Sequence, residues 1–292
     1  MGLFGFNYSK PGPGVDKDAP KKKGIFLFFE LFFRKFWKLI QANMLYFICS
    51  IPMLLIVYFA SPFLVSPLIE MLRAGGIEEE MLTMTSSALT VFFTVTIVSF
   101  LGSGPASAAF AYILRCFTRE QHSWILSDFK EKFKENFKQG IIVSIVDILL
   151  LVLGYVAIMF YSSMAVNNLY GMGRLWTFLQ VFLCMLLVIY MFMHFYIYQL
   201  MVTFENSMKQ LYKNAAVFAL AFLPMNILLG GIFFVLNYLL FSTVTPPFAV
   251  ILAFVLWFGI IRFPIEFYAA RTIQRRVLDQ QAKPEEDRSD KE

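Results

Sequence analysis

Long apolar runs separated by short polar segments dominate the chain from residue 43 onward. A helix rises about 1.5 Å per residue, so it needs about 20 apolar residues to cross a hydrocarbon layer about 30 Å thick. Six runs meet this length, and the pattern therefore predicts an all-α polytopic membrane helical bundle of about six transmembrane helices. The expected spans are Asn43–Leu64, Thr83–Leu101, Gly140–Tyr161, Leu175–Thr203, Val217–Phe241 and Phe248–Ala270.

An amphipathic segment with helical spacing precedes each outward-going span. Lys and Arg occupy the other side of each segment, so we expect cytoplasmic interfacial helices with the apolar face in the acyl boundary and the cations toward anionic headgroups. The alternative is helices of a soluble core. The apolar stripes are Phe26, Phe29, Phe33, Phe36, Trp37 and Ile40; then Phe129, Phe133 and Phe137; then Met208, Leu211 and Tyr212.

These segments predict a threefold internal pattern of basic interfacial helix, outgoing span and return span. If the pattern holds, the protein consists of three helical hairpins packed together. The second apolar run is interrupted by Gly102, Ser103, Gly104 and Pro105. Such a break is tolerated where other helices or water satisfy the freed backbone groups. Residues 83–117 therefore form either one long kinked helix or a span followed by a short re-entrant helix, and the break is a candidate polar cavity.

The distribution of Lys and Arg predicts the orientation of the spans. Of the 25 basic residues, 22 fall in alternate extramembrane segments, two fall in the intervening segments, and Arg262 lies within a span. Cytoplasmic segments carry the excess of Lys and Arg, so we expect both termini in the cytoplasm. The expected organisation is a polar cytoplasmic segment over 1–24, a six-helix transmembrane domain with interfacial helices over 25–270, and a charged cytoplasmic tail over 271–292.

Composition supports this interpretation and excludes others. The chain is 59% hydrophobic and 15% charged, against roughly 45–50% and about 25% in soluble domains. The net charge of +5 comes from basic segments that flank spans, so we expect contact with lipid headgroups and not with nucleic acid. Cys49, Cys116 and Cys184 lack metal-ligand spacing. The first 24 residues are polar, and we expect no signal peptide.

Four ionisable residues stand inside the apolar runs: Asp147, His194, Arg262 and Glu266. Intramembrane charge is costly and marks candidate functional positions. Asp147 and Arg262 are expected at similar depth and are candidates to pair, whereas Glu266 can pair with Arg262 by i,i+4 spacing. The cluster either fixes helix packing or binds a ligand or ion. His194, Asn226 and Asn237 are expected to form hydrogen bonds between helices, a proton relay through His194 being the alternative.

Catalytic constellations are absent from the sequence. No HExxH, GxSxG, GxxxxGK[ST] or strand-linked GxGxxG motif occurs, and His122 beside Ser123 lacks a third orienting group. We therefore expect no enzyme activity, no catalytic residue, no cofactor and no metal site.

Three segments carry a family resemblance: MGLFGFNYSKPGPGV, FLFFELFFRKFWKLIQAN and GPASAAFAYILRCFTREQHSWILSDFKEKFKENFKQG. They resemble the YesL-like bacterial membrane proteins, which are defined by a domain of unknown function, across roughly Met1–Pro52 and Gly104–Gly140. A stretch of about 40 residues near Tyr58–Phe100, with an acidic outer loop, departs from the family pattern, so the chain resembles an elongated variant. The resemblance implies the cytoplasmic membrane of a Gram-positive-type bacterium and genes beside carbohydrate-uptake transporters, and it implies no functional residues.

Two functional hypotheses follow. The first is a non-enzymatic accessory or regulatory subunit of a bacterial carbohydrate (ABC-type) uptake system, with sugar ABC transporter permease subunits as partners. The alternative is a small stand-alone membrane transporter or channel, whose path would use the helix break and the four intramembrane ionisable residues. An intramembrane enzyme is a third, weaker hypothesis, since it would need catalytic groups that converge at one depth.

Overall fold

A computed structural model describes residues 24–278, and within this range the chain is helical without strands. Six helices are long and apolar enough to cross a membrane, which confirms the predicted all-α multi-pass bundle. The predicted polar segment up to residue 23 and the tail beyond residue 278 lie outside the described residues. The helices are α1 (Gly24–Arg34), α2 (Phe36–Ala74), α3 (Glu79–Leu101), α4 (Pro105–Thr118), α5 (Ile125–Glu135), α6 (Phe137–Val166), α7 (Gly173–Met201), α8 (Met208–Ala221), α9 (Leu223–Thr243), α10 (Pro246–Leu252) and α11 (Phe258–Ile273), with π-helical turns at Ala253–Trp257 and Gln274–Leu278 and a 3₁₀ turn at Leu169–Gly171.

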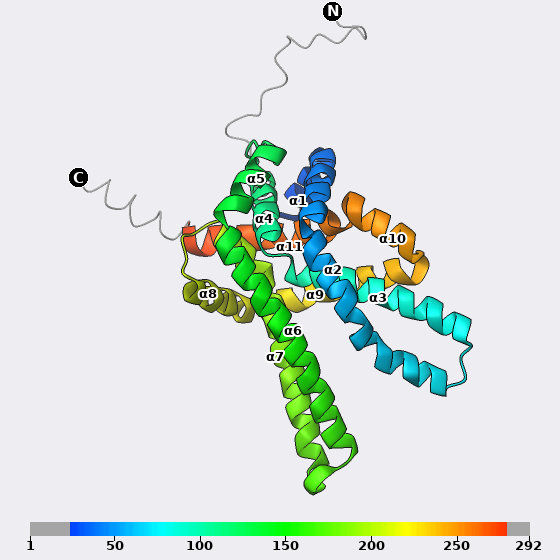
Figure 1. Cartoon of the computed structure of the whole chain (residues 1–292). Helices are drawn as coiled ribbons and strands as arrows, with labels where there is room; N and C mark the ends of the chain where they lie inside the picture. The colour runs from blue at the N-terminus through cyan, green and yellow to red at the C-terminus, as the bar shows by residue number, and fades with distance from the viewer. Residues whose placement is uncertain (1–23, 279–292) are drawn as a thin grey trace, which may run out of the picture.

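The spans form three hairpins, each introduced by a short helix (Figure 1). Hairpin one is α2 with α3, hairpin two is α6 with α7, and hairpin three is α9 with α10 and α11. A single residue separates each short helix from its span, and all three have similar backbone angles: Lys35 (φ −102°, ψ 9°), Asn136 (φ −93°, ψ 11°) and Phe222 (φ −114°, ψ 27°). These angles lie in the sparsely allowed bridge region, which interrupts a helix. The threefold pattern is thus present in the structure.

Two boundaries differ from the sequence prediction because of such interruptions. The break at Phe222 places the start of the fifth span at Leu223, whereas the apolar pattern placed it at Val217. The second predicted span ends at Leu101, and α4 begins as a separate helix at Pro105. Residues 83–117 are therefore not one continuous helix, because Gly102 and Gly104 both have positive φ, at +87° and +57°.

Each outgoing helix packs against the preceding hairpin, in cyclic order. In α6, Gly140 meets the backbone at Gly104, since a Cβ on Gly140 would lie 2.8 Å from the Gly104 carbonyl carbon. In α9, the side-chain oxygen of Asn226 accepts a hydrogen bond from the Tyr196 hydroxyl of α7 at 2.8 Å. The first helix of the first hairpin packs against hairpin three, which closes the cycle.

Asn43 makes that closing contact between α2 and the last span. Its Nδ2 donates to the carbonyl oxygens of Ala253 and Phe254 at 3.0 and 2.7 Å, and its Oδ1 accepts from the Gly259 amide at 2.7 Å. A π-helical turn displaces backbone groups from the α-helical hydrogen-bond ladder. Asn43 satisfies the groups displaced by the turn at Ala253–Trp257.

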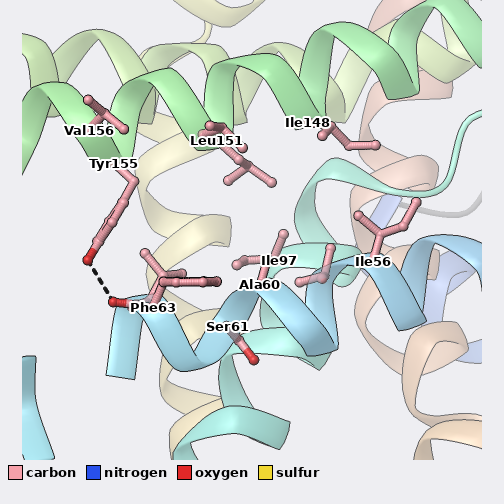
Figure 2. Close-up of a pocket in the computed structure, with 12 residues that line it drawn as sticks. Ile56, Ala60, Ser61, Phe63, Ile97, Ile148, Leu151, Tyr155 and Val156 are labelled. Carbon is pink, nitrogen blue, oxygen red and sulfur yellow. Dashed lines mark hydrogen bonds between the residues drawn. The ribbon is translucent and has the colours of Figure 1, made fainter. Parts of the chain in front are cut away.

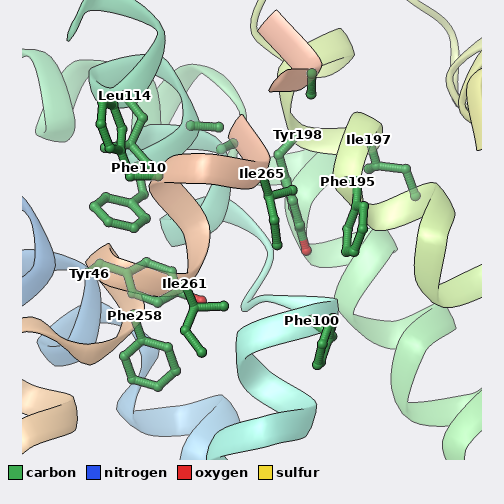
Figure 3. Packing of buried hydrophobic residues seen from close by; sticks show 14 of the residues in the cluster. Tyr46, Phe100, Phe110, Leu114, Phe195, Ile197, Tyr198, Phe258, Ile261 and Ile265 are labelled. Atoms are coloured by element: carbon green, nitrogen blue, oxygen red, sulfur yellow. The ribbon is translucent and has the colours of Figure 1, made fainter. Parts of the chain in front are cut away.

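The helix α4 forms the centre of the hydrophobic core. It contacts α2, α6, α7 and α11, and all its residues except Tyr112 and Arg115 are buried. The ring of Phe110 stacks on Tyr46 at 4.8 Å between centroids, and Phe258 meets Tyr46 edge-on at 5.3 Å (Figure 3). A helix that is apolar on all sides is stable only when buried. The short helix that follows the break therefore lies inside the bundle.

The amphipathic helices behave in two ways. The α1 stripe points away from the protein, with Phe26 65% exposed, as expected of an interfacial helix. By contrast, Phe129 of α5 and Leu211 of α8 are buried in the core. The interfacial prediction is therefore wrong for the apolar faces of α5 and α8, because these faces cover α4 and α7 instead of entering the acyl boundary.

Candidate functional site

Asp147 lies on the buried side of α6, where α7 places two side chains against it. The Tyr190 hydroxyl donates a hydrogen bond to Asp147 Oδ1 at 2.5 Å, and His194 Nε2 lies 2.9 Å from the same oxygen without the alignment of a hydrogen bond. Tyr190 and His194 meet one carboxylate because residues four apart share a helix face. Asp147 Oδ2 is buried and has no hydrogen-bond partner among residues 24–278.

Arg262 and Glu266 form the second buried ion pair, within α11. Arg262 Nη2 donates to Glu266 Oε1 at 2.9 Å, as the i,i+4 spacing predicts. The guanidinium carbon lies 5.8 Å from the ring centre of Tyr46 and 5.3 Å from that of Tyr198. Aromatic faces attract a cation when they replace water around it. The structure thus separates Arg262 from Asp147 and gives each ionisable residue a partner other than the pairing expected from depth.

Tyr198 lies between the two ion pairs. Its hydroxyl donates to the Leu101 carbonyl oxygen at 2.9 Å and accepts from the Gly104 amide at 3.3 Å. Its ring lies 6.1 Å from the His194 ring, on the side away from Arg262. One side chain therefore caps the end of α3, contacts the guanidinium and borders the imidazole.

Side-chain hydroxyls fill the break between α3 and α4. The Ser103 amide donates to Ser107 Oγ at 2.8 Å, and the hydroxyls of Ser50 and Ser103 lie 2.5 Å apart. A Cβ on Gly102 would come within 2.4 Å of Ser107 Oγ. The break predicted as a candidate polar cavity is consequently closed by protein groups that satisfy the freed backbone.

An apolar cleft separates hairpin one from hairpin two, and we call it the hairpin cleft. It comprises two adjoining cavities of about 360 and 340 Å³ that share Leu64, Ile97, Leu151 and Tyr155. Figure 2 shows the first cavity, with Ile148, Leu151, Tyr155 and Val156 of α6 facing Ile56, Ala60 and Phe63 of α2. Asp147 and Tyr190 line the second cavity. The cleft therefore joins apolar walls to one buried carboxylate.

One hydrogen bond spans the cleft. The Tyr155 hydroxyl donates to the Phe63 carbonyl oxygen at 2.8 Å (Figure 2). That carbonyl is available because Pro67, four residues later in α2, has no N–H to donate. The proline thus creates the acceptor that ties the two hairpins.

Several functional side chains escaped the sequence analysis. Tyr190 and Tyr198 flank His194 at intervals of four, and this polar stripe within an apolar run was the available signal. Tyr212 of α8 stacks on Tyr190 with 6.5 Å between ring centres. Burial, with a smaller contribution from the charge of Asp147, raises the pKa of the Tyr212 phenol to about 12. The phenol therefore stays neutral near pH 7.

The two intramembrane asparagines take the structural roles expected of them. Asn226 bonds to Tyr196 of α7, as described above, and Asn237 accepts from the Trp257 indole at 3.0 Å. Among residues 24–278, no group of three or more His, Cys, Asp or Glu side chains comes together. The polar sites of the described chain are thus pairs, and only the pair at Asp147 borders the hairpin cleft.

A family model described as "Protein of unknown function, DUF624" matches residues 84–158, about a quarter of the chain. The match confirms the YesL-like resemblance over this range, which holds Asp147 and the break at Gly102–Pro105 but not His194, Arg262 or Glu266. It also includes residues 84–100, which the sequence analysis assigned to an inserted stretch, so that part is shared with the family. Comparison with curated proteins and with solved structures gives no match.

Proposed function

We propose that this multi-pass membrane protein, which shares residues 84–158 with the YesL-like family of unknown function, is a non-enzymatic accessory subunit. In this proposal the hairpin cleft binds a transmembrane helix of a partner, the permease subunit of a bacterial carbohydrate ABC importer. The observation that carries the proposal is a buried carboxylate with a free oxygen in an apolar cleft. The importer as partner rests on the family resemblance alone.

The physics of helix association in membranes favours such an anchor. Lipid tails are as apolar as the walls of the cleft, so apolar contact alone does not select a partner helix. Packing and interhelical hydrogen bonds provide the selectivity instead. Asp147 Oδ2 offers an acceptor inside the cleft, and we expect the partner helix to carry a basic or hydrogen-bond-donating residue at that depth.

The second ion pair supports a structural role for the remaining polar groups. Arg262 is buried between two tyrosine rings and paired with Glu266, and hydroxyl groups fill the break beside it. These groups hold helices together without offering a path of charges across the bundle. The proposal therefore assigns recognition to the hairpin cleft and packing to α11.

We also propose the bacterial cytoplasmic membrane as the location, with both termini in the cytoplasm. The lopsided distribution of basic residues supports this orientation. Contacts between segments that the orientation assigns to one side agree with it: Arg34 of α1 pairs with Glu120 at 3.0 Å, and Arg119 donates to Gln274 at 2.5 Å. Cysteine labelling from each side of sealed vesicles would test it.

Co-purification from native membranes tests the accessory role. The tagged protein should recover importer permease subunits in mild detergent at native expression levels. Leu151→Trp fills the cleft and Asp147→Asn removes its charge, so both variants should lose the partner. Leu153→Trp is the matched control, because Leu153 lies on the same helix, is exposed and does not line the cleft. Recovery of no transporter subunit, or equal recovery by all three variants, would contradict the proposal.

A stand-alone transporter is the second candidate, favoured by one observation. The Asp147–His194 pair is a titratable site beside the hairpin cleft, close to the Gly102–Pro105 break. The purified protein in liposomes would then carry protons or sugars above the rate of empty liposomes, and Asp147→Asn would abolish the flux. Absence of flux with the wild-type protein would exclude this candidate.

A further inference from the structure

A second groove, distinct from the hairpin cleft, lies between α1, α9 and α11. Its volume is about 420 Å³. Phe28 of α1 and Met225 and Leu229 of α9 provide apolar walls, and Arg271 and Arg275 of the last helix also line it. The groove therefore combines a hydrocarbon-like surface with two cations.

The two arginines have no anionic partner among the described residues. Arg271 packs against Gly24 and over the Phe267 ring, with its guanidinium carbon 5.4 Å from the ring centre, and its Nη1 is buried without a hydrogen-bond partner. No described carboxylate forms an ion pair with Arg271 or Arg275. Like charges four residues apart repel each other on a helix. An anion bound between them would relieve that repulsion and satisfy the buried donor.

The position of α1 fixes the depth of the groove in the membrane. Ile25 and Phe26, at the start of α1, are exposed apolar side chains, as expected where a helix lies at the boundary between acyl chains and headgroups. A Cβ on Gly24, in the same turn, would lie 3.7 Å from the Arg271 guanidinium carbon. Arg271 is therefore at the level of lipid headgroups, while Leu229, one helical turn beyond Met225, extends the apolar wall toward the hydrocarbon.

We propose that this groove is a binding site for one anionic phospholipid. The phosphate lies between Arg271 and Arg275, whose planar forks match phosphate oxygens, and one acyl chain lies along Met225, Leu229 and Phe28. Basic pockets between transmembrane helices bind headgroups in this way. The site does not depend on the accessory function, because neither the hairpin cleft nor Asp147 contributes to it.

Native mass spectrometry of the full chain in detergent tests the proposal with two lipids of identical acyl chains, phosphatidylglycerol and phosphatidylcholine. The wild-type protein should retain one phosphatidylglycerol in preference to phosphatidylcholine. Arg271→Gln with Arg275→Gln should weaken phosphatidylglycerol binding at least about tenfold, since two charge-assisted contacts are lost, and leave phosphatidylcholine binding unchanged. Arg275→Gln alone provides a readout if the double variant fails to fold, because Arg275 is exposed.

Two matched controls separate the site from general electrostatics and from a free-phosphate site. Lys134→Gln with Lys138→Gln removes the same charge from exposed positions on α5 and α6, and should leave phosphatidylglycerol binding intact. Met225→Trp should block the lipid, whereas Leu228→Trp, exposed on the same helix and away from the groove, should not. Equal loss in the lysine control, equal affinity for both lipids, or displacement by millimolar inorganic phosphate would each overturn the proposal.

Discussion

The two buried ion pairs have similar chemistry but different surroundings. Arg262 and Glu266 belong to one helix, and two tyrosine rings enclose the guanidinium. Asp147 and His194 belong to different helices, and the carboxylate keeps a free oxygen beside a cavity. Burial of charge therefore does not by itself identify a functional site in a membrane bundle. Access from a cavity distinguishes a recognition group from one that fixes packing.

The largest expected effect is at the enclosed pair. Arg262→Met leaves the Glu266 carboxylate buried without its cation and should reduce the free energy of unfolding by about 3–5 kcal/mol. Arg262→Met combined with Glu266→Gln removes both charges and should recover most of that loss. Unfolding by SDS titration in detergent micelles measures both variants. A single variant as stable as wild type would show that the pair is open to solvent.

The next effect concerns the contact that positions Asp147. A Cβ on Gly140 would lie 2.5 Å from the Pro105 nitrogen, and backbone atoms cannot move aside as a flexible side chain does. Gly140→Ala should therefore destabilise the protein by about 1–3 kcal/mol through overpacking. Gly231→Ala is the control, because nothing lies within 4 Å of the added Cβ. Equal melting temperatures for the two variants would contradict the close packing of α6 on α4.

A smaller effect on stability is expected at the cavity-lining pair. Asp147→Asn keeps an acceptor for Tyr190 and leaves His194 free to stay neutral, so the cost should be about 1 kcal/mol. Partner recovery should nevertheless fall about tenfold, because the cleft loses its charged acceptor. Measuring melting and recovery on the same samples sharpens the contrast with Arg262. A loss of stability as large as that of Arg262→Met would abolish the distinction.

The smallest effect is at the bond across the cleft. Tyr155→Phe removes the donor to the Phe63 carbonyl and should reduce stability by about 0.6 kcal/mol, the average for such bonds in membrane proteins. Tyr170→Phe, in the exposed turn after α6, should change nothing. Thermal unfolding in detergent distinguishes the two variants. An unchanged melting temperature in Tyr155→Phe would mean that the cleft width does not depend on this bond.

Local rules explain what the sequence could predict. Six spans follow from apolar length, and the Arg262–Glu266 pair follows from i,i+4 spacing within one helix. The Asp147–His194 pair depends on the register of α6 against α7, which periodicity does not specify. The apolar stripe of α5 was misjudged because a lipid boundary and a protein core select the same residues, so Phe129 fits both. The family match adds a range but no register.

Asn43 has a consequence for the biogenesis of the protein. Its carbonyl partner at Ala253 lies 210 residues further along the chain, in the last span. During synthesis from the N-terminus, the first helix therefore enters the bilayer with an amide that has no partner until the ribosome has made the final helix. Chains truncated before that point retain an unsatisfied amide in the hydrocarbon, a mark by which membrane quality control can distinguish an unfinished polypeptide from a finished one.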